Sequence, residues 1–180
     1  MQIYNVDYSS IFDIIKTDSS RAIIDIAAEY IGTNENRLEE VIQLAVTEKY
    51  PINMRAARVV EFSAQRNKGY IAERLDFIVK ISTTSKNDGV KRAFIKVTEA
   101  FLPYEIADDL LGLVINNCFE KLNGIEAVAV KYYAINCLMK IIKKEPDLKN
   151  ELLISLHDQL GKNTVAFDRY MKKKIKKLDK

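Results

Sequence analysis

The chain has 180 residues, of which 48% are hydrophobic and 29% are charged, and its formal net charge is +3. This composition excludes a disordered chain, because enough apolar side chains are present to build a core. Six Gly and three Pro are too few for an all-β sandwich or barrel, which needs a turn signal about every 8–12 residues. We therefore expect a mostly helical protein.

Apolar spacing and turn signals divide the chain into about ten short helices. In chain order they are predicted at 8–16, 18–31, 35–49, 53–67, 70–82, 88–102, 104–122, 126–145, 147–160 and 164–178. All three prolines and five of the six glycines fall at or beside the junctions, as expected of residues that end helices. Side-chain oxygens suited to N-caps stand at Asp18, Asn34, Asn53, Asp88, Asp147 and Thr164.

Four short stretches recur along the chain, and they begin at Met54, Val90, Val130 and Phe167, with offsets of 36, 40 and 37 residues. A period of this size predicts stacked helical repeats, because a lone helix hairpin cannot bury its apolar stripe. The predicted buried stripes are Val90, Ala93, Phe94, Val97 and Phe101; Val130, Tyr133, Ala134, Cys137, Leu138 and Ile141; and Phe167, Tyr170, Met171, Ile175 and Leu178.

Three of these stretches open with an apolar residue followed by a basic one, namely Met54-Arg55, Val90-Lys91 and Val130-Lys131. In this respect the chain resembles the HEAT and armadillo class of helical repeats. The resemblance implies an all-α fold, an α-α superhelix (HEAT-like solenoid) of about five antiparallel helix pairs, in a single domain over residues 1–180. The approximate pairs are 8–32, 34–67, 70–102, 104–145 and 147–178.

The chain departs from the family pattern in two places. The family usually places an Asp a few residues before the basic residue, forming a ladder between repeats, and Glu48, Asp88 and Glu126 are only approximate stand-ins. In the last repeat Asp168 replaces the basic residue. We therefore predict HEAT-like stacking without the ladder. A plain helical bundle is the alternative fold.

Motifs for catalysis or cofactor binding are absent from the sequence. It contains no Gly-rich phosphate loop, no His-Glu-x-x-His and no Cys-x-x-Cys spacing. The single histidine, His157, is interpreted as structural, and Cys118 and Cys137 lie in apolar helical patterns typical of buried thiols. The acidic pair Asp108-Asp109 is interpreted as part of a solvated helix face. We expect no enzyme activity, no catalytic residue, no cofactor and no metal.

A membrane span is not expected either. The longest uncharged stretch near the middle, Leu110 to Phe119, has ten residues, whereas a spanning helix needs about 20. The N-terminal residues lack the basic and apolar segments of a signal peptide. These observations predict a cytoplasmic protein.

Charge differs between the two helices of each predicted pair. The second helices at 51–67, 87–102, 125–145 and 163–180 are net positive, whereas none of the first helices at 34–50, 70–82, 104–123 and 147–161 is. In the family resembled, second helices line the inner curve of the solenoid. The predicted function is therefore a scaffold that binds a protein or peptide, possibly an acidic one, through this mildly basic inner face. An ordinary solvated face is the alternative.

The residues predicted to bind the partner point away from the apolar stripes of the second helices. They are Arg92, Lys96, Tyr132, Asn136, Arg169 and Lys173, and the equivalent positions in the first repeat are Ala56 and Val60.

Nucleic-acid binding is the second functional hypothesis, because some HEAT-like DNA alkylation repair proteins cradle DNA in a basic concavity. Residues 162–180 carry eight Lys or Arg against two Asp. A terminal repeat also needs a polar outer face, which favours a capping role for this lysine-rich helix. We rank nucleic acid second because the excess charge is modest and because we find no aromatic cluster that follows the basic residues at repeat spacing.

Overall fold

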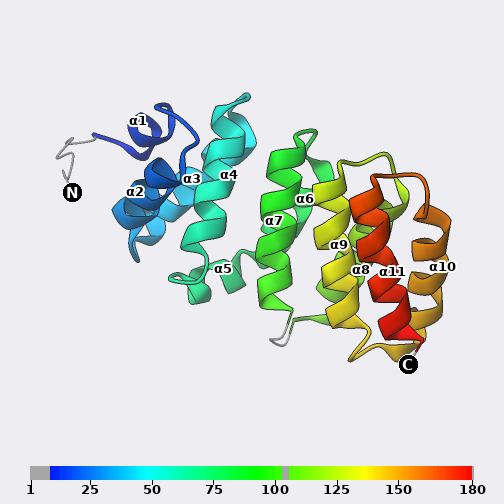
Figure 1. The fold of residues 1–180 in the computed structure, drawn as a ribbon. Coiled ribbons are helices and arrows are strands. Elements are labelled where there is room, and N and C mark those ends of the chain that lie inside the picture. The colour runs from blue at the N-terminus through cyan, green and yellow to red at the C-terminus, as the bar shows by residue number, and fades with distance from the viewer. Residues whose placement is uncertain (1–8, 103–105, 180) are drawn as a thin grey trace. The chain divides into compact units, whose positions relative to one another are not determined.

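The computed structural model describes residues 9–102 and 106–179, and every regular element in these ranges is a helix (Figure 1). Its elements are α1 (Ile11–Ile15), α2 (Arg21–Ile31), α3 (Glu35–Thr47), α4 (Ile52–Ser63), α5 (Lys68–Glu73), α6 (Leu75–Thr84), α7 (Asp88–Phe101), α8 (Asp108–Asn123), α9 (Val128–Ile141), the 3-10 helix η1 (Pro146–Leu148), α10 (Lys149–Gln159) and α11 (Val165–Leu178). The all-α prediction is confirmed. The predicted helix start at 104 lies outside the described residues, and α8 begins at Asp108.

Helix starts follow the expected chemistry, although not always at the predicted residue. Asn34 and Thr164 cap α3 and α11 by accepting a backbone N–H, as predicted. Ser20 and Asn87, and not Asp18 and Asp88, cap α2 and α7. The predicted caps Asn53 and Asp147 are wrong, because Asn53 lies inside the first turn of α4 and Asp147 inside η1.

The predicted helix at 70–82 is in fact two helices, α5 and α6. They are separated at Arg74, whose N–H is shared among the carbonyl oxygens of Tyr70, Ile71 and Ala72 and whose backbone leaves helical geometry. Neither Gly nor Pro marks this break, so turn signals in the sequence do not indicate it.

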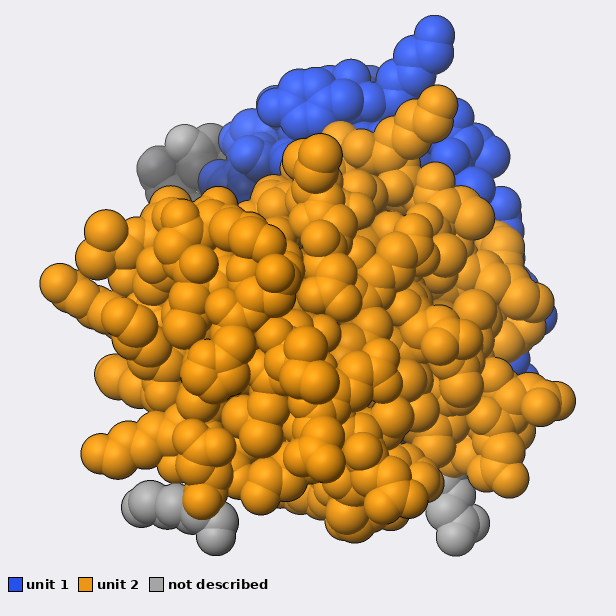
Figure 2. Space-filling model, turned by 90° about the vertical axis from the view of Figure 1, so that its right-hand side faces the viewer, with its two compact units in different colours: residues 1–74 blue, residues 75–180 orange. Residues whose placement is uncertain are grey.

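Backbone contacts divide the chain into two compact units, residues 1–74 and 75–180, which Figure 2 shows in different colours. In unit 1, α4 packs against both α2 and α3, and α1 packs against α2. Its core includes the fully buried side chains of Ile14, Ile24, Leu38 and Ile42. Arg55 of α4 donates hydrogen bonds to the carbonyl oxygens of Ile15 and Lys16, at 3.0 and 2.9 Å, and so satisfies the free end of α1.

Two surface positions predicted in the first repeat are wrong. Ala56 and Val60 are both fully buried, because α4 lies between α2 and α3 and both of its sides are covered. The predicted partner-binding positions that are accessible are therefore confined to unit 2.

A polar contact joins α3 to α5 within unit 1. The hydroxyl of Tyr70 donates to the carboxylate of Glu39, which also accepts from Gln43 at 2.8 Å. The hydrogen bond from Tyr70 lowers the pKa of Glu39 below its ordinary 4.5, and the hydrogen bond from Gln43 lowers it further. The positive charge of Arg74 adds to this effect.

Replacing Tyr70 with Phe is therefore expected to destabilise the protein in a pH-dependent way. A lowered carboxyl pKa contributes stability above the unfolded pKa, and this contribution is lost as the pH falls through the folded value. Because Glu39 is 32% exposed, we expect a loss of about 0.5–1 kcal/mol near pH 7 that shrinks near pH 3. Urea denaturation at both pH values measures it. A loss of the same size at both would mean that the ionised carboxylate is not involved.

Unit 2 consists of three helix pairs, α6 with α7, α8 with α9, and α10 with α11. The first helices of the pairs contact one another, α6 with α8 and α8 with α10, and the second helix α7 contacts α9 (Figure 1). The pairs α6-α7 and α8-α9 thus pack on each other in two layers, and the last pair packs on α8 through α10. This is the repeat stacking expected when no hairpin has a core of its own.

The predicted apolar stripes of unit 2 lie in this core. All five stripe residues of α7 are buried, with Phe94 fully so, and in α9 all are buried except Tyr133. In α11, Phe167, Met171, Ile175 and Leu178 are buried while the lysines between them face outward. The predicted burial of these apolar positions is confirmed. The contact of α11 with α10 belongs to its own pair, and α11 reaches the preceding pair through Tyr170, whose hydroxyl donates to Asn136 of α9.

Candidate interaction surface

The six residues predicted to bind a partner lie on the second helices of unit 2. Arg92 and Lys96 are on α7, Tyr132 and Asn136 on α9, and Arg169 and Lys173 on α11. We call this surface the α7-α9-α11 face. Tyr132, Arg169 and Lys173 are exposed, and the other three are half-buried.

Three tyrosines form an aromatic cluster in the middle of this face. The ring of Tyr132 lies 4.6 Å from that of Tyr170 and 5.1 Å from that of Tyr133, centroid to centroid. Phe167 stacks on Tyr170 from the core side at 5.8 Å. We call Tyr132, Tyr133 and Tyr170 the tyrosine cluster. Its rings join α9 to α11, because Tyr170 belongs to the last helix.

Hydrogen bonds and cations surround the tyrosine cluster. The amide oxygen of Asn136 accepts from the Tyr170 hydroxyl at 2.7 Å and from the Lys174 ammonium at 3.2 Å. Lys174 also lies 4.9 Å from the Tyr170 ring centroid, and Lys96 lies 5.7 Å from that of Tyr133. These distances are typical of cation–π contacts. Asn136 therefore holds the side chains of Tyr170 and Lys174 in place by accepting a hydrogen bond from each.

Burial shifts the pKa of Tyr170, in the tyrosine cluster, and that of the neighbouring Lys174. Burial, with smaller contributions from Tyr132 and Glu99, raises the pKa of Tyr170. The phenol therefore stays protonated and donates a hydrogen bond to Asn136. Burial, followed by the charge of Lys177, lowers the pKa of Lys174. The hydrogen bond to Asn136 and the contact with the Tyr132 ring hold the Tyr170 ring in place.

Only part of the predicted set is joined to the cluster. Lys96, Tyr132 and Asn136 contact it directly. Among the described residues, no hydrogen bond, ion pair or ring contact links Arg92, Arg169 or Lys173 to it. These three cations lie on the same helices, and two of them are exposed.

The prediction missed three members of this group, Tyr133, Tyr170 and Lys174. Both tyrosines were assigned to buried stripes, whereas the structure half-buries them. The expectation that no aromatic cluster accompanies the basic residues is wrong. One signal was present, because Tyr132 and Tyr170 follow Lys131 and Arg169 directly and are 38 residues apart, which is one repeat length.

The basic residues at the start of the second helices point inward and fix the helices that carry the face. The Lys91 ammonium lies 2.5 Å from Glu126, in the turn before α9, and 3.4 Å from Asp88. Lys131 donates to the amide oxygen of Gln159 on α10 at 2.6 Å. Each lysine thus ties its second helix to the next pair.

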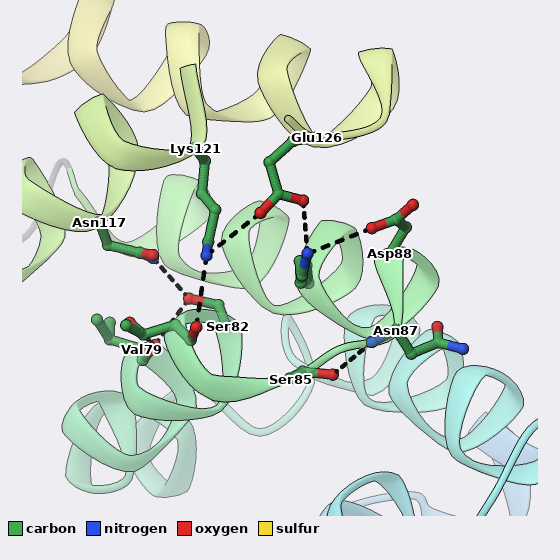
Figure 3. A network of polar contacts seen from close by, with 10 residues as sticks. Val79, Ser82, Ser85, Asn87, Asp88, Asn117, Lys121 and Glu126 are labelled. Carbon is green, nitrogen blue, oxygen red and sulfur yellow. Dashed lines mark hydrogen bonds and ion pairs between the residues drawn. The ribbon is translucent and has the colours of Figure 1, made fainter. Parts of the chain in front are cut away.

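Figure 3 shows that Glu126 is shared by two cations. Lys121 of α8 lies 3.4 Å from its other oxygen and donates to the Thr83 carbonyl. The hydrogen bond of Glu126 and its charge, assisted by Asp88, outweigh burial and raise the pKa of Lys91. Lys91 therefore forms ion pairs with Asp88 and Glu126 that link two repeats. The sequence analysis did not predict this ladder contact.

The same network continues into α6. The amide of Asn117 donates to the Ser82 hydroxyl at 2.8 Å, and Ser82 donates to the Val79 carbonyl at 2.7 Å (Figure 3). All of these groups are buried or nearly so, so they stabilise the stacking of α6 on α8 and do not offer a free binding surface.

The other reactive side chains lie apart from the face. Cys118 and Cys137 are buried, as predicted, and burial together with the neighbouring Cys118 raises the pKa of Cys137. His157 is exposed on α10. Within residues 9–102 and 106–179, no three His, Cys, Asp or Glu side chains gather where a metal ion would bind. The helices in these ranges include none with the length and apolarity to span a membrane.

A family model described as a HEAT repeat domain matches residues 13–177 of the chain. No curated protein and no solved structure shows significant similarity to it.

Proposed function

Because the chain belongs to the HEAT repeat family, we propose that it is a non-enzymatic scaffold that binds a protein or peptide on the α7-α9-α11 face. HEAT repeats commonly mediate protein interactions, and stacked repeats present extended surfaces suited to this role. The proposed contact residues are Arg92, Lys96, Tyr132, Asn136, Arg169 and Lys173.

The tyrosine cluster is the observation that supports this proposal most. Tyr and Arg are enriched where protein interfaces gain most of their binding energy, because they combine apolar area with polar groups. Tyr132 is 38% exposed yet held by two neighbouring rings. A ring that is already ordered loses little conformational entropy when a partner covers it.

The charges around the cluster favour an acidic partner. Arg92, Lys96, Arg169 and Lys173 add four cations to the face. Complementary charge mainly steers association and fixes orientation, whereas apolar contacts supply affinity. A peptide with both carboxylates and apolar side chains matches this combination.

Reversing the charges of Arg92 and Lys96 to Glu is expected to weaken partner binding and leave the fold intact. Exposed or half-exposed charges usually change stability by no more than about 0.5 kcal/mol each. We expect at least about a tenfold loss of affinity. The measurement is pull-down of native-cell proteins by the immobilised chain, quantified against wild type, with thermal unfolding measured in parallel.

A matched control reverses two cations of the same unit that lie outside the α7-α9-α11 face. Lys80 of α6 is 62% exposed and pairs with the neighbouring Asp76 across one helical turn. Lys86 is exposed in the turn before α7. The Lys80→Glu, Lys86→Glu variant is expected to retain the partner. Equal loss in both double variants would mean that net charge, and not the face, controls binding.

Nucleic-acid binding is the second candidate, and the tyrosine cluster also favours it. Aromatic rings beside cations form stacking platforms for single-stranded bases. A gel-shift titration at several salt concentrations distinguishes the two functions. No shift with DNA or RNA at low salt would exclude this candidate, whereas affinity that falls steeply with salt would support it.

Two further predictions accompany the proposal. The first is that the protein has no enzyme activity, and it is based on the absence of catalytic and cofactor-binding motifs from the sequence. The cytoplasmic location is tested by fractionating cells that produce the native protein and detecting the chain by immunoblot.

A further inference from the structure

A groove separate from the α7-α9-α11 face lies at the end of unit 2 where α9 and α11 terminate and α10 begins. It has a volume of about 240 Å³ and is lined by Met139, Ile142, Lys143, Lys149, Lys177 and Leu178. We call it the terminal groove. None of its residues belongs to the α7-α9-α11 face, so a ligand in the groove is independent of the proposed function.

The floor of the terminal groove is apolar. Met139 and Leu178 are almost fully buried, at 8% and 5% exposed, and Ile142 at the end of α9 is half-buried. Pockets for drug-sized ligands usually occupy roughly 300–1,000 Å³, so the groove is smaller than such a pocket. Its size suits an apolar side chain of a larger partner.

The rim of the groove carries three lysines and no acidic residue. Elsewhere in unit 2, lysines near carboxylates form ion pairs, as Lys140 does with Glu99 and Lys162 with Asp158. Within the part of the chain that the structure describes, no hydrogen bond or ion pair joins the ammonium of Lys143, Lys149 or Lys177 to another residue.

Lys149 is informative because of its place in the helix. It is the first residue of α10 and directly follows the 3-10 helix η1, so it lies far from the helix C-terminus, where the dipole would favour a cation. Lys143 and Lys177 lie at or after helix C-termini, where the dipole favours cations, so these two need no ligand to explain them. The dipole of α10 therefore does not stabilise the positive charge of Lys149.

We propose that the terminal groove binds an acidic peptide segment. One apolar side chain of the segment enters between Ile142 and Leu178, and carboxylates on either side of it pair with Lys143, Lys149 and Lys177. The charge complementarity of the rim selects the acidic sequence, and the floor selects the apolar residue.

The experiment uses the full chain and a fluorescein-labelled peptide in which a single Leu is flanked by Glu and Asp residues. Binding is followed by fluorescence anisotropy. The Lys149→Glu, Lys177→Glu variant is expected to bind about tenfold or more weakly. Ile142→Ser, which changes no charge, is expected to weaken binding by a similar factor, as is replacing the peptide Leu with Ser.

Control measurements separate this site from general electrostatics. Lys86→Glu, in the turn before α7, is expected to leave binding unchanged. The melting temperature of each variant shows whether it is folded. Equal affinity for the Leu and Ser peptides, together with unchanged binding by folded Ile142→Ser, would overturn the proposal. Tighter binding of a single-stranded oligonucleotide than of the Leu peptide, at the same charge, would also overturn the proposal. The phosphate backbone makes no contact that requires the apolar floor.

Discussion

Replacing Phe94 with Ala is expected to lower the free energy of unfolding by about 3–5 kcal/mol. Phe94 is fully buried and is the largest such side chain in the described residues. It lies on α7, which packs against both α6 and α9, so the cavity opens between neighbouring helix pairs. Urea denaturation followed by circular dichroism measures the loss.

The matched control removes an apolar side chain that does not contribute to the stack. Ile154 on α10 is 71% exposed, so Ile154→Ala is expected to change stability by no more than about 0.5 kcal/mol. A loss below about 1 kcal/mol for Phe94→Ala would show that the helix pairs do not depend on one another's apolar faces.

Replacing Glu126 with Gln is expected to destabilise the protein by about 3 kcal/mol, near the lower end of the range for breaking a buried ion pair. The substitution keeps the size of the side chain but leaves Lys91 and Lys121 without their shared counter-charge. The side chains of Glu126, Lys91 and Lys121 are only 10%, 12% and 6% exposed, so water does not replace the lost partner.

Asp88→Asn is the control for this network. Asp88 also pairs with Lys91, at 3.4 Å, but its side chain is 55% exposed, and exposed pairs contribute about 0–1 kcal/mol. The two variants are compared by urea denaturation at neutral pH. Equal losses for Asp88→Asn and Glu126→Gln would contradict a special role for the buried carboxylate.

Helical periodicity predicted the core of unit 2 well because it reports which side of each helix is apolar. Phe94, Cys137 and Met171 are buried where the spacing indicated. It fails where a helix is apolar on two sides. Ala56 and Val60 were assigned to the surface, and only the packing of α4 between α2 and α3 explains their burial.

Amphipathic side chains and contacts between repeats were harder to predict. A tyrosine in an apolar stripe satisfies the same pattern whether its ring enters the core or lies at its edge, so Tyr133 and Tyr170 were missed as surface residues. Glu126 lies 35 residues from Lys91, and their pairing depends on the turn before α9. The sequence alone offered Glu126 only as an approximate ladder residue.

The claim that a protein partner docks on the second helices is tested most directly by site-specific photocrosslinking. A benzoylphenylalanine is placed either at Lys173, exposed on α11, or at His157, exposed on α10. Irradiation of native cells followed by nuclease or protease treatment identifies the chemical class of each adduct. We predict protein adducts from position 173 and none from position 157. Adducts that contain nucleic acid, or equal protein adducts at both positions, would contradict docking of a protein on this face.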